Sequence, residues 1–536
     1  MEEWAGESRG RYEIRPSLRY HIIPSNTGTE RMRRESLPSI TLQPLFHGVE
    51  TVEDKIFWRH YINRFSNVLT VETEAKNAFK DIILHLANRH QGLMHSILSV
   101  SSRHIDFDAP YGIKLLQDNP STNRKALEHR SDYHHDEAMK RFYEDMSDYL
   151  EPDDPEYHTE EYQSLLCARY GQILFRLLQT RVEGNTMGEH RVHLRGYQTL
   201  IQHSPPEDPA FYAFITEIFQ YHIYADDLIW HPDSKIDRLS SDEWEPVHTD
   251  HSPRLLGVVD GLLRQLSDIT NLRMRIREHM VNKVDPPVDY IMLFHGAEIS
   301  TSIQEWTPDW PAGDSRNRVG LLYKQVMFIY LFRTIYTPSS MPRATMSSLS
   351  SLSSSVSSTP QRRASMATSV ISTASAPAST STNVSQRLSM THSCPSSRNP
   401  SRNNSMHEGD NTFAVSDGHG PSSPPPKRRP ANEDVRLLTA VEESLQILET
   451  FSPSEPAQTL LLIPCFVVGI ACFNEEHRVR VRQAIKAVRG YTGLRHCDRV
   501  AAVLEEVWRF MDDGEWIAVW DWQAIARGLG MDIPCT

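Results

Sequence analysis

Residues 57–105 read FWRHYINRFSNVLTVETEAKNAFKDIILHLANRHQGLMHSILSVSSRHI, and their apolar spacing indicates the architecture of the whole chain. Two sets of residues recur at the spacing of one helix face, with a break at Gly92 between them. The first set is Phe79, Ile82, Ile83 and Leu86, and the second is Leu93, Ile97, Val100 and Ser101. The stretch therefore predicts two successive helices.

A shorter helix is expected before these two. Thr51 and Asp54 have the spacing of a capping box, in which each residue bonds the backbone N–H of the other. The second long helix carries many small side chains, which would let neighbouring backbones approach closely, at Ser96, Ser99, Ser101 and Ser102. We expect a helical hairpin buried in a larger all-helical domain.

The remaining periodic segments extend this prediction along the chain. Helical stripes are expected near residues 138–149, 162–178, 190–201, 211–230, 254–266, 267–283, 290–306 and 319–330, and again at 435–445, 460–473 and after 503, with a polar connection at 106–124. No alternating strand pattern of comparable length competes with them. The predicted fold is all-α, a multi-helix domain of paired antiparallel helices.

Composition limits where such a chain would act. Its 536 residues carry a net charge of −13 and 39% hydrophobic residues, without a run of the ~20 apolar residues that a membrane span needs and without an apolar signal peptide. The six cysteines form no CxxC pair, so we expect reduced intracellular thiols. An acidic chain repels polyanions unless a basic face is segregated, and no such face is apparent.

Two segments differ in composition from the helical parts. Residues 1–50 mix Arg, Ser and Pro without periodicity, which is typical of a disordered N-terminal tail. Residues 338–432 are rich in Ser, Thr, Pro and Asn and cannot bury enough apolar surface to offset their conformational entropy. We therefore expect a helical first part at 51–337, a disordered insertion at 338–432, and a second helical part at 433–536 that completes the same core.

The order of several segments resembles a known family. NAFKDIILHLANRHQGLMHSILSVSSRH (77–104), GEHRVHLRGYQTLI (188–201), SPRLLGVVDGLLRQLSDITNLRMR (252–275), GLLYKQVMFIYLFRTIY (320–336) and VLEEVWRFMDDGEWIAVWDWQAIARGLGMDI (503–533) are similar to successive parts of the fungal-specific transcription factor domain. That domain is the regulatory region of binuclear zinc-cluster regulators. The resemblance implies an all-helical regulatory domain, transcriptional regulation and a nuclear location.

One departure from the family affects the expected mode of action. The family's usual N-terminal zinc cluster is absent from this sequence, whose first cysteine is Cys167, although a truncated gene model would look the same. We therefore expect contact with DNA only indirectly, through protein partners such as a zinc-cluster regulator or through a homodimer. A small-molecule effector is a further expected partner, and no membrane is expected.

Candidate metal and aromatic sites compete with ordinary packing. His129, His134, His135, Asp136 and Glu137 are close in sequence, and His190 and His193 have i, i+3 spacing, but neither set follows a known ligand pattern. The tryptophans at 508, 516, 520 and 522 could form a stacking platform, yet their apolar neighbours favour core packing. Cys465 and Cys472 could be redox partners, and buried free thiols are the favoured interpretation. We expect neither a metal site nor a cofactor.

No enzyme signature is apparent. The sequence contains no GxSxG elbow, no phosphate-binding GxxxxGK[ST] loop and no GxGxxG after a strand. The acidic pairs Glu505–Glu506 and Asp512–Asp513 would suit acid–base chemistry, but they are more typical of solvated charge at a helix end. We predict no enzyme and no catalytic residues. A helical small-molecule-binding protein or enzyme, and a phospho-regulated adaptor, remain the alternatives.

Short motifs in the polar segments indicate transport and modification. Lys427, Arg428 and Arg429 form a basic cluster suited to nuclear import, or else a solvated charge run. Ser36 follows the basic stretch RMRRE, and Ser365 lies two residues after Arg363, so both are candidate sites for basophilic kinases.

Overall fold

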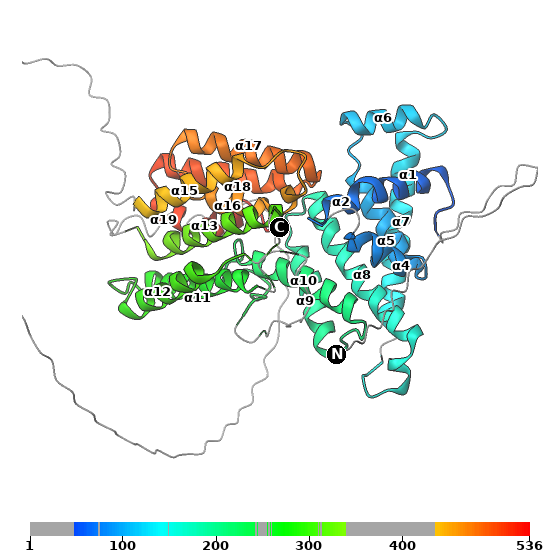
Figure 1. The fold of residues 1–536 in the computed structure, drawn as a ribbon, viewed down its shortest axis with the longest axis horizontal. Coiled ribbons are helices and arrows are strands. Elements are labelled where there is room, and N and C mark those ends of the chain that lie inside the picture. Colours follow the sequence, from blue (N-terminus) through cyan, green and yellow to red (C-terminus); the bar gives the residue numbers. More distant parts are fainter. Residues whose placement is uncertain are drawn as a thin grey trace, which may run out of the picture. The chain divides into compact units, whose positions relative to one another are not determined.

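We examined a computed structural model of the 536-residue chain. It describes residues 48–338 and 435–536, except 73–75, 148–149, 242–243, 245–254, 256–257, 259, 309 and 311–312. Throughout these ranges the ordered elements are helices, and no strand is present apart from one isolated bridge between Met187 and Asp532 (Figure 1). The predicted all-α fold is thus confirmed. None of the described helices has the length and apolarity required to cross a membrane.

The stretch from Thr51 to Ile105 folds into several short helices and one long one. These are α1 (Val52–His60), the π-helical turn η1 (Tyr61–Phe65), α2 (Ser66–Val68), α3 (Ala78–Asp81), α4 (Ile83–Ala87) and α5 (Gln91–His104). The Thr51–Asp54 capping box is confirmed, with Asp54 N–H donating to Thr51 Oγ1 and Thr51 N–H to Asp54 Oδ2. The predicted break at Gly92 is wrong, because Gly92 lies inside α5 and the chain breaks just before it.

Helix α5 is the centre of the N-terminal part. It packs most extensively against α7 (Arg124–Ser147) and α8 (Glu160–Glu183). The close approach of these helices depends on small residues, as predicted. Ser102 Oγ lies 2.6 Å from Ser131 Oγ of α7. Leu93 packs against Gly171 of α8, where a Cβ atom would lie only 3.0 Å from Leu93 Cδ1. The helix is buried on nearly every side.

The segment between α5 and α7 differs from its prediction as a polar connection. Residues Pro110–Asp118 form helix α6, which starts with proline at its first position, where no N–H partner is lost. Beyond α7, the short η3 turn (Pro155–His158) leads into α8. The sequence did not predict α6, because only one of its residues, Gly112, is fully buried and the segment therefore has no marked apolar stripe.

The middle of the chain adds five long helices. They are α9 (Glu189–His203), α10 (Pro209–Asp226), α11 (Leu262–Val281), α12 (Tyr290–Glu305) and α13 (Ser315–Ile335). The predicted division into helices at 254–266 and 267–283 is wrong, since α11 continues through residue 267. Helices α11, α12 and α13 pack against one another as a layer.

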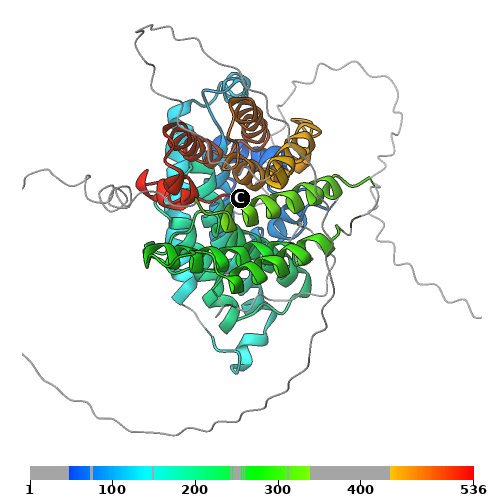
Figure 2. The same ribbon diagram turned by 90° about the vertical axis from the view of Figure 1, so that its left-hand side faces the viewer.

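The C-terminal part consists of α15 (Val435–Glu449), η4 (Pro456–Leu460), α16 (Leu462–Gly469), α17 (Glu475–Thr492), α18 (His496–Asp513), α19 (Trp516–Trp520) and α20 (Trp522–Gly528). Figures 1 and 2 both show α15 (gold) alongside α13 (light green), and the two helices are in contact. Buried residues of both parts belong to one hydrophobic core. The tail at 1–47 and the predicted insertion from residue 339 onward lie outside the described residues.

Candidate functional site

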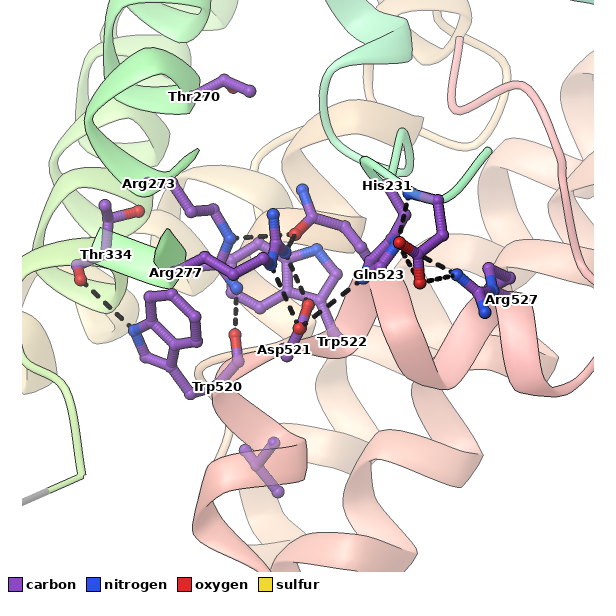
Figure 3. A network of polar contacts seen from close by, with 12 residues as sticks. His231, Thr270, Arg273, Arg277, Thr334, Trp520, Asp521, Trp522, Gln523 and Arg527 are labelled. Carbon is purple, nitrogen blue, oxygen red and sulfur yellow. Dashed lines mark hydrogen bonds and ion pairs between the residues drawn. The ribbon is translucent and has the colours of Figure 1, made fainter. Parts of the chain in front are cut away.

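A buried group of polar and aromatic side chains joins α11 to the C-terminal helices (Figure 3). We call Arg273, Arg277, Trp520, Asp521, Trp522 and Gln523 the arginine–tryptophan junction. Its centre is Arg273, which has no exposed surface and whose guanidinium carbon lies 4.1 Å from the Trp520 ring centre and 3.7 Å from that of Trp522. Arg273 Nε donates to Gln523 Oε1 over 2.9 Å, and Nη2 donates to the Trp520 carbonyl.

The negative charge of the junction comes from Asp521. Arg277 Nη2 donates to Asp521 Oδ1 over 2.6 Å, and His231 Nε2 lies 3.8 Å from Oδ2. Burial by itself would raise the pKa of Asp521, but the nearby Arg277 and His231 hold it below its usual range. Burial, with Arg277 adding repulsion, lowers the pKa of Arg273 to about 9. Both groups remain ionised at neutral pH.

Positive charge exceeds negative charge around this junction. The guanidinium groups of Arg273 and Arg277 both act on the carboxylate of Asp521. The buried Arg333 of α13 adds a third cation near Arg273, and its Nη2 donates to the Val519 carbonyl over 3.1 Å. Three buried polar atoms here have no hydrogen-bond partner in the described structure, namely Arg273 Nη1, Arg333 Nε and Thr334 Oγ1. Cations with unused donors are suited to an anionic group such as a carboxylate or phosphate.

A second polar network continues from the junction toward α10. Arg238 is bidentate to Asp227, with Nε–Oδ1 and Nη2–Oδ2 distances of 2.8 and 2.6 Å, and it also bonds Ser267 of α11. The two networks are connected, because Gln523 Nε2 donates to the Asp227 carbonyl over 3.2 Å and Trp522 Nε1 to the Leu228 carbonyl over 2.9 Å. The C-terminal helices are thereby tied to the middle of the chain.

The histidines predicted as possible metal ligands make other contacts. His134 of α7 bonds Asp54 Oδ1 over 2.7 Å and His95 Nδ1 over 2.8 Å, while its sequence neighbours His129 and Asp136 are exposed. Burial and the adjacent His134 lower the pKa of His95 to about 4. Within the described ranges no three His, Cys, Asp or Glu side chains converge on a point where they could hold a metal.

The second candidate pair of metal ligands, His190 and His193, is also not arranged around a common point. His190 Nε2 bonds Asp226 Oδ1 over 2.9 Å, and Arg191 Nε bonds the same carboxylate over 2.8 Å. Burial lowers the pKa of His193 to about 4, with Arg176 and His190 contributing. This cluster fastens α9 to α10.

The tryptophans and cysteines pack as predicted. Trp508, Trp520 and Trp522 are buried, whereas Trp516 is half-buried. The five cysteines of the described segments are free and buried, so the favoured interpretation of Cys465 and Cys472 is confirmed. Burial raises the pKa of the Cys472 thiol to about 12, which makes it a poor nucleophile.

Helix α17 is the most obvious place for a basic face, but its arginines are paired with acids. Arg478 binds Asp512, Arg480 binds Glu442 and Glu449, Arg482 binds Glu475 and Glu505, and Arg489 binds Asp498. The acidic pairs that had suggested acid–base chemistry are therefore engaged with arginines, since Arg509 also binds Glu506 and Asp513. Few cations of this surface are left to neutralise a phosphate backbone.

The junction itself was missed at the level of sequence. Arg273 lies between Ile269 and Ile276 on the buried face of α11, and an arginine in an apolar stripe is the one available signal. Lys427, Arg428, Arg429, Ser36 and Ser365 lie outside the described residues, so their predicted roles stay predictions.

Comparison with known proteins supports the resemblance seen in the sequence. The model of the fungal specific transcription factor domain matches residues 55–402 and 417–534, which include every helix of the described core except the first residues of α1. No curated protein and no solved structure gives a match. The match covers most of the sequence and follows the order of its helices, and the chain therefore belongs to the fungal-specific transcription factor domain family.

Proposed function

We propose that this chain is a nuclear regulator of transcription in a fungus that acts through protein contacts of its helical domain. The observation that supports this most is the family match on both sides of the insertion, together with one core shared by both helical parts. The family is that of a fungal-specific transcription factor domain, so this membership supports a role in the regulation of transcription.

The finer part of the proposal is that the isolated chain does not bind DNA sequence-specifically. Recognition requires cations that neutralise phosphates and an element presented to the base edges. The net charge is −13, and the arginines of α17 are held in ion pairs. Promoter occupancy would then depend on a partner, of which a regulator that carries a zinc cluster is the natural candidate.

Chromatin occupancy of the tagged full-length chain tests the proposal. We expect occupancy at a defined set of promoters that disappears when the partner is deleted, and a gel-shift assay with purified chain that shows no selective binding at physiological salt. Occupancy that persists without any partner, or nanomolar selective binding by the purified chain, would contradict indirect recruitment.

Nuclear import is proposed to use Lys427, Arg428 and Arg429. Replacing all three with alanine is expected to shift a fluorescent fusion toward the cytoplasm, because import receptors recognise clustered positive charge. Replacing Arg398 and Arg402 of the same polar segment is the control. An unchanged nuclear signal in the triple variant would exclude this cluster as the import motif.

A small-molecule effector is the second candidate, supported by the excess of positive charge at the arginine–tryptophan junction. A ligand that binds only the folded chain at 100 times its Kd adds about 2.7 kcal/mol to the free energy of unfolding. We expect citrate or phosphate to raise the melting temperature more than chloride at equal ionic strength, and to lose this effect in Arg333→Ala. Equal stabilisation by chloride would argue against an anionic effector at this place.

A further inference from the structure

Arg176 of α8 is a buried arginine without an acidic partner. Only 7% of its surface is exposed, and it makes no ion pair with any described residue. Burial lowers the pKa of Arg176 to about 10, so its guanidinium group is still charged at neutral pH. A buried charge without a counter-ion costs free energy, which makes the residue a candidate binding group.

The unused atoms of Arg176 form one edge of its guanidinium group. Its Nε and Nη2 are both buried without a hydrogen-bond partner, and among the described arginines this is true of both atoms only in Arg176. The same edge binds carboxylates elsewhere in the chain. Arg130 uses it for Asp54, with Nε–Oδ1 and Nη2–Oδ2 distances of 2.6 and 2.9 Å, and Arg238 uses it for Asp227. Arg176 therefore presents two parallel donors that match two oxygens of an oxyanion.

The other end of the guanidinium group is held in place. Arg176 Nη1 donates to Gln179 Oε1 over 3.2 Å and lies 3.5 Å from His135 Nδ1. Gln179 Nε2 in turn donates to Glu183 Oε1 over 2.8 Å. These contacts fix the plane of the guanidinium group, so that its unused edge has a definite direction before a ligand binds. Donors that are already ordered lose little side-chain entropy on binding.

The surroundings of this edge favour negative charge. Arg103 of α5 acts on Arg176 as a second cation, and its own Nε is also buried without a partner. Burial, with Arg176 nearby, lowers the pKa of His193 of α9, and neither ring nitrogen of this neutral residue is hydrogen-bonded to another described residue. Glu183, the acid that acts on Arg176, already accepts bonds from Arg103 and Gln179. An added anion would thus meet donors from three helices.

The cluster reaches the surface at its border. His135 and His193 are partly exposed, and Tyr143 of α7, which is near enough to Arg176 to affect its charge, is 66% exposed. Exposed side chains change rotamer within nanoseconds, so a ligand can uncover the buried edge without unfolding a helix. Because the edge lies beneath the surface, the ligand has to be small.

We propose that Arg176, with Arg103 and His193, forms a site for a small molecule that carries a carboxylate or phosphate group. Two oxygens of this group would accept from Nε and Nη2 of Arg176. The inference goes beyond the proposed function and does not depend on it, because no residue of this site belongs to the arginine–tryptophan junction. Helices α5, α7 and α8 pack against one another around the site (Figure 1), so a bound ligand is expected to tighten their packing.

Hydrogen–deuterium exchange of the full-length chain tests the site, because it reports on each helix separately. We expect inorganic phosphate or acetate to slow exchange in α7 and α8 relative to chloride at equal ionic strength. The more protective of the two anions identifies the group that the ligand carries. Protection by neither anion, or protection confined to α11 and α20 at the junction, would overturn the proposal.

Two replacements of Arg176 separate a binding role from a structural one. Arg176→Gln should abolish the protection, and Arg176→Lys, which keeps the charge but loses the two-point edge, should raise the anion Kd by at least about tenfold. Arg195→Gln, at an exposed position of α9, is the matched control and should bind like the wild type. The comparison with Arg176→Lys stands even if Arg176→Gln does not fold. Unchanged protection in Arg176→Gln, or an unchanged Kd in Arg176→Lys, would contradict the proposal.

Discussion

Arg273 shows how one residue connects distant parts of the chain. Its guanidinium group is buried between the rings of Trp520 and Trp522 and bonds both Gln523 and the Trp520 carbonyl. Charged hydrogen bonds contribute about 1.5–3 kcal/mol and desolvated cation–π contacts about 2 kcal/mol. A side chain with so many buried contacts is expected to contribute more to stability than the charged residues around it.

The first prediction compares Arg273→Ala with Arg275→Ala. Loss of Arg273 leaves the buried Trp520 carbonyl without its donor and a cavity between two rings, so we expect the free energy of unfolding to fall by about 2–4 kcal/mol. Arg275 is exposed on the same helix, and its replacement should change stability by less than about 0.5 kcal/mol. Urea denaturation measures both, and equal stabilities would contradict the structural role of the junction.

The second prediction concerns His104, which bonds the Thr492 carbonyl over 2.7 Å and His60 over 2.8 Å. Burial lowers the pKa of His104 to about 4, against about 6.5 in an unfolded chain. Between these values the unfolded chain binds more protons than the folded chain, so stability falls as the pH falls. Each tenfold difference in proton affinity is worth about 1.4 kcal/mol, so His104 alone should cost about 3 kcal/mol by pH 4.

Denaturation of wild type and His104→Gln between pH 7.5 and pH 5 checks this sign. The variant should lose less stability on acidification than the wild type, because one titrating group has been removed. His129→Gln, at an exposed position of α7, should lose as much stability on acidification as the wild type. A pH dependence that is identical in all three proteins would refute the assignment.

Each helix depends on its ends as well as on its apolar face, and α1 illustrates both. Thr51 caps α1 without reaching α7 in any hydrogen bond described, whereas Asp54 caps α1 and is also bonded to Arg130 and His134 of α7. Burial alone would raise the pKa of Asp54, but its bonds to His134 and Arg130 keep it low, so the carboxylate is ionised. The same residue therefore starts one helix and attaches it to another.

The third prediction follows from this difference. Thr51→Ala should cost about 1 kcal/mol, as is usual for a lost N-cap. Asp54→Ala should cost about 3–5 kcal/mol, because it leaves the half-buried Arg130 and the buried His134 without their acceptor. Thermal denaturation of the two variants compares their losses of stability. Similar losses in both would show that the contact between α1 and α7 contributes little to stability.

At the scale of elements, apolar periodicity predicted where most helices lie, but it did not predict where they begin and end. The capping box and the small residues of α5 are where the sequence predicts them. The division of α11 into two helices failed because nothing at residue 267 interrupts its backbone, and α6 was missed because it buries little surface. Helix α17 buries an apolar face with Val481, Ile485 and Val488, while the charges of its many arginines are balanced by acidic residues, most of them on neighbouring helices.

The candidate site could not be predicted in the same way, because it is formed by residues far apart in sequence. Arg273 and Gln523 are separated by 250 positions, and no local pattern pairs them. The exposure of Tyr290 and Phe294 at the start of α12 is also invisible in the sequence, where both have the appearance of core residues. Only the packing of α11 and α13 shows which face of α12 is covered.

At the scale of the whole molecule, the two helical parts share polar contacts as well as a core. Tyr323 of α13 donates to the Leu460 carbonyl over 2.8 Å, and Thr459 donates to the Val68 carbonyl over 3.1 Å. Gly493 lies where these parts meet, with φ of 71° and a position at which a Cβ would approach His104 Nε2 to 2.5 Å. Its neighbours leave no room for a larger residue.

The fourth prediction concerns the two parts as one folding unit. Deleting residues 345–430 should leave the melting transition nearly unchanged, because no described core residue is removed. Ending the chain at residue 337 should abolish cooperative folding, because buried residues of α13 lose the surface provided by α15 and α16. A cooperative transition in a fragment of residues 51–337 would contradict a shared core.

The central claim is that this chain regulates transcription through protein contacts. Its most direct test fuses the full-length chain to an unrelated DNA-binding domain and measures a reporter in fungal cells under that domain's operator. The account predicts a reporter change, of either sign, that requires the operator and is lost when the core is disrupted by Asp54→Ala. A reporter that responds no differently from the DNA-binding domain alone, with the fusion present in the nucleus, would contradict it.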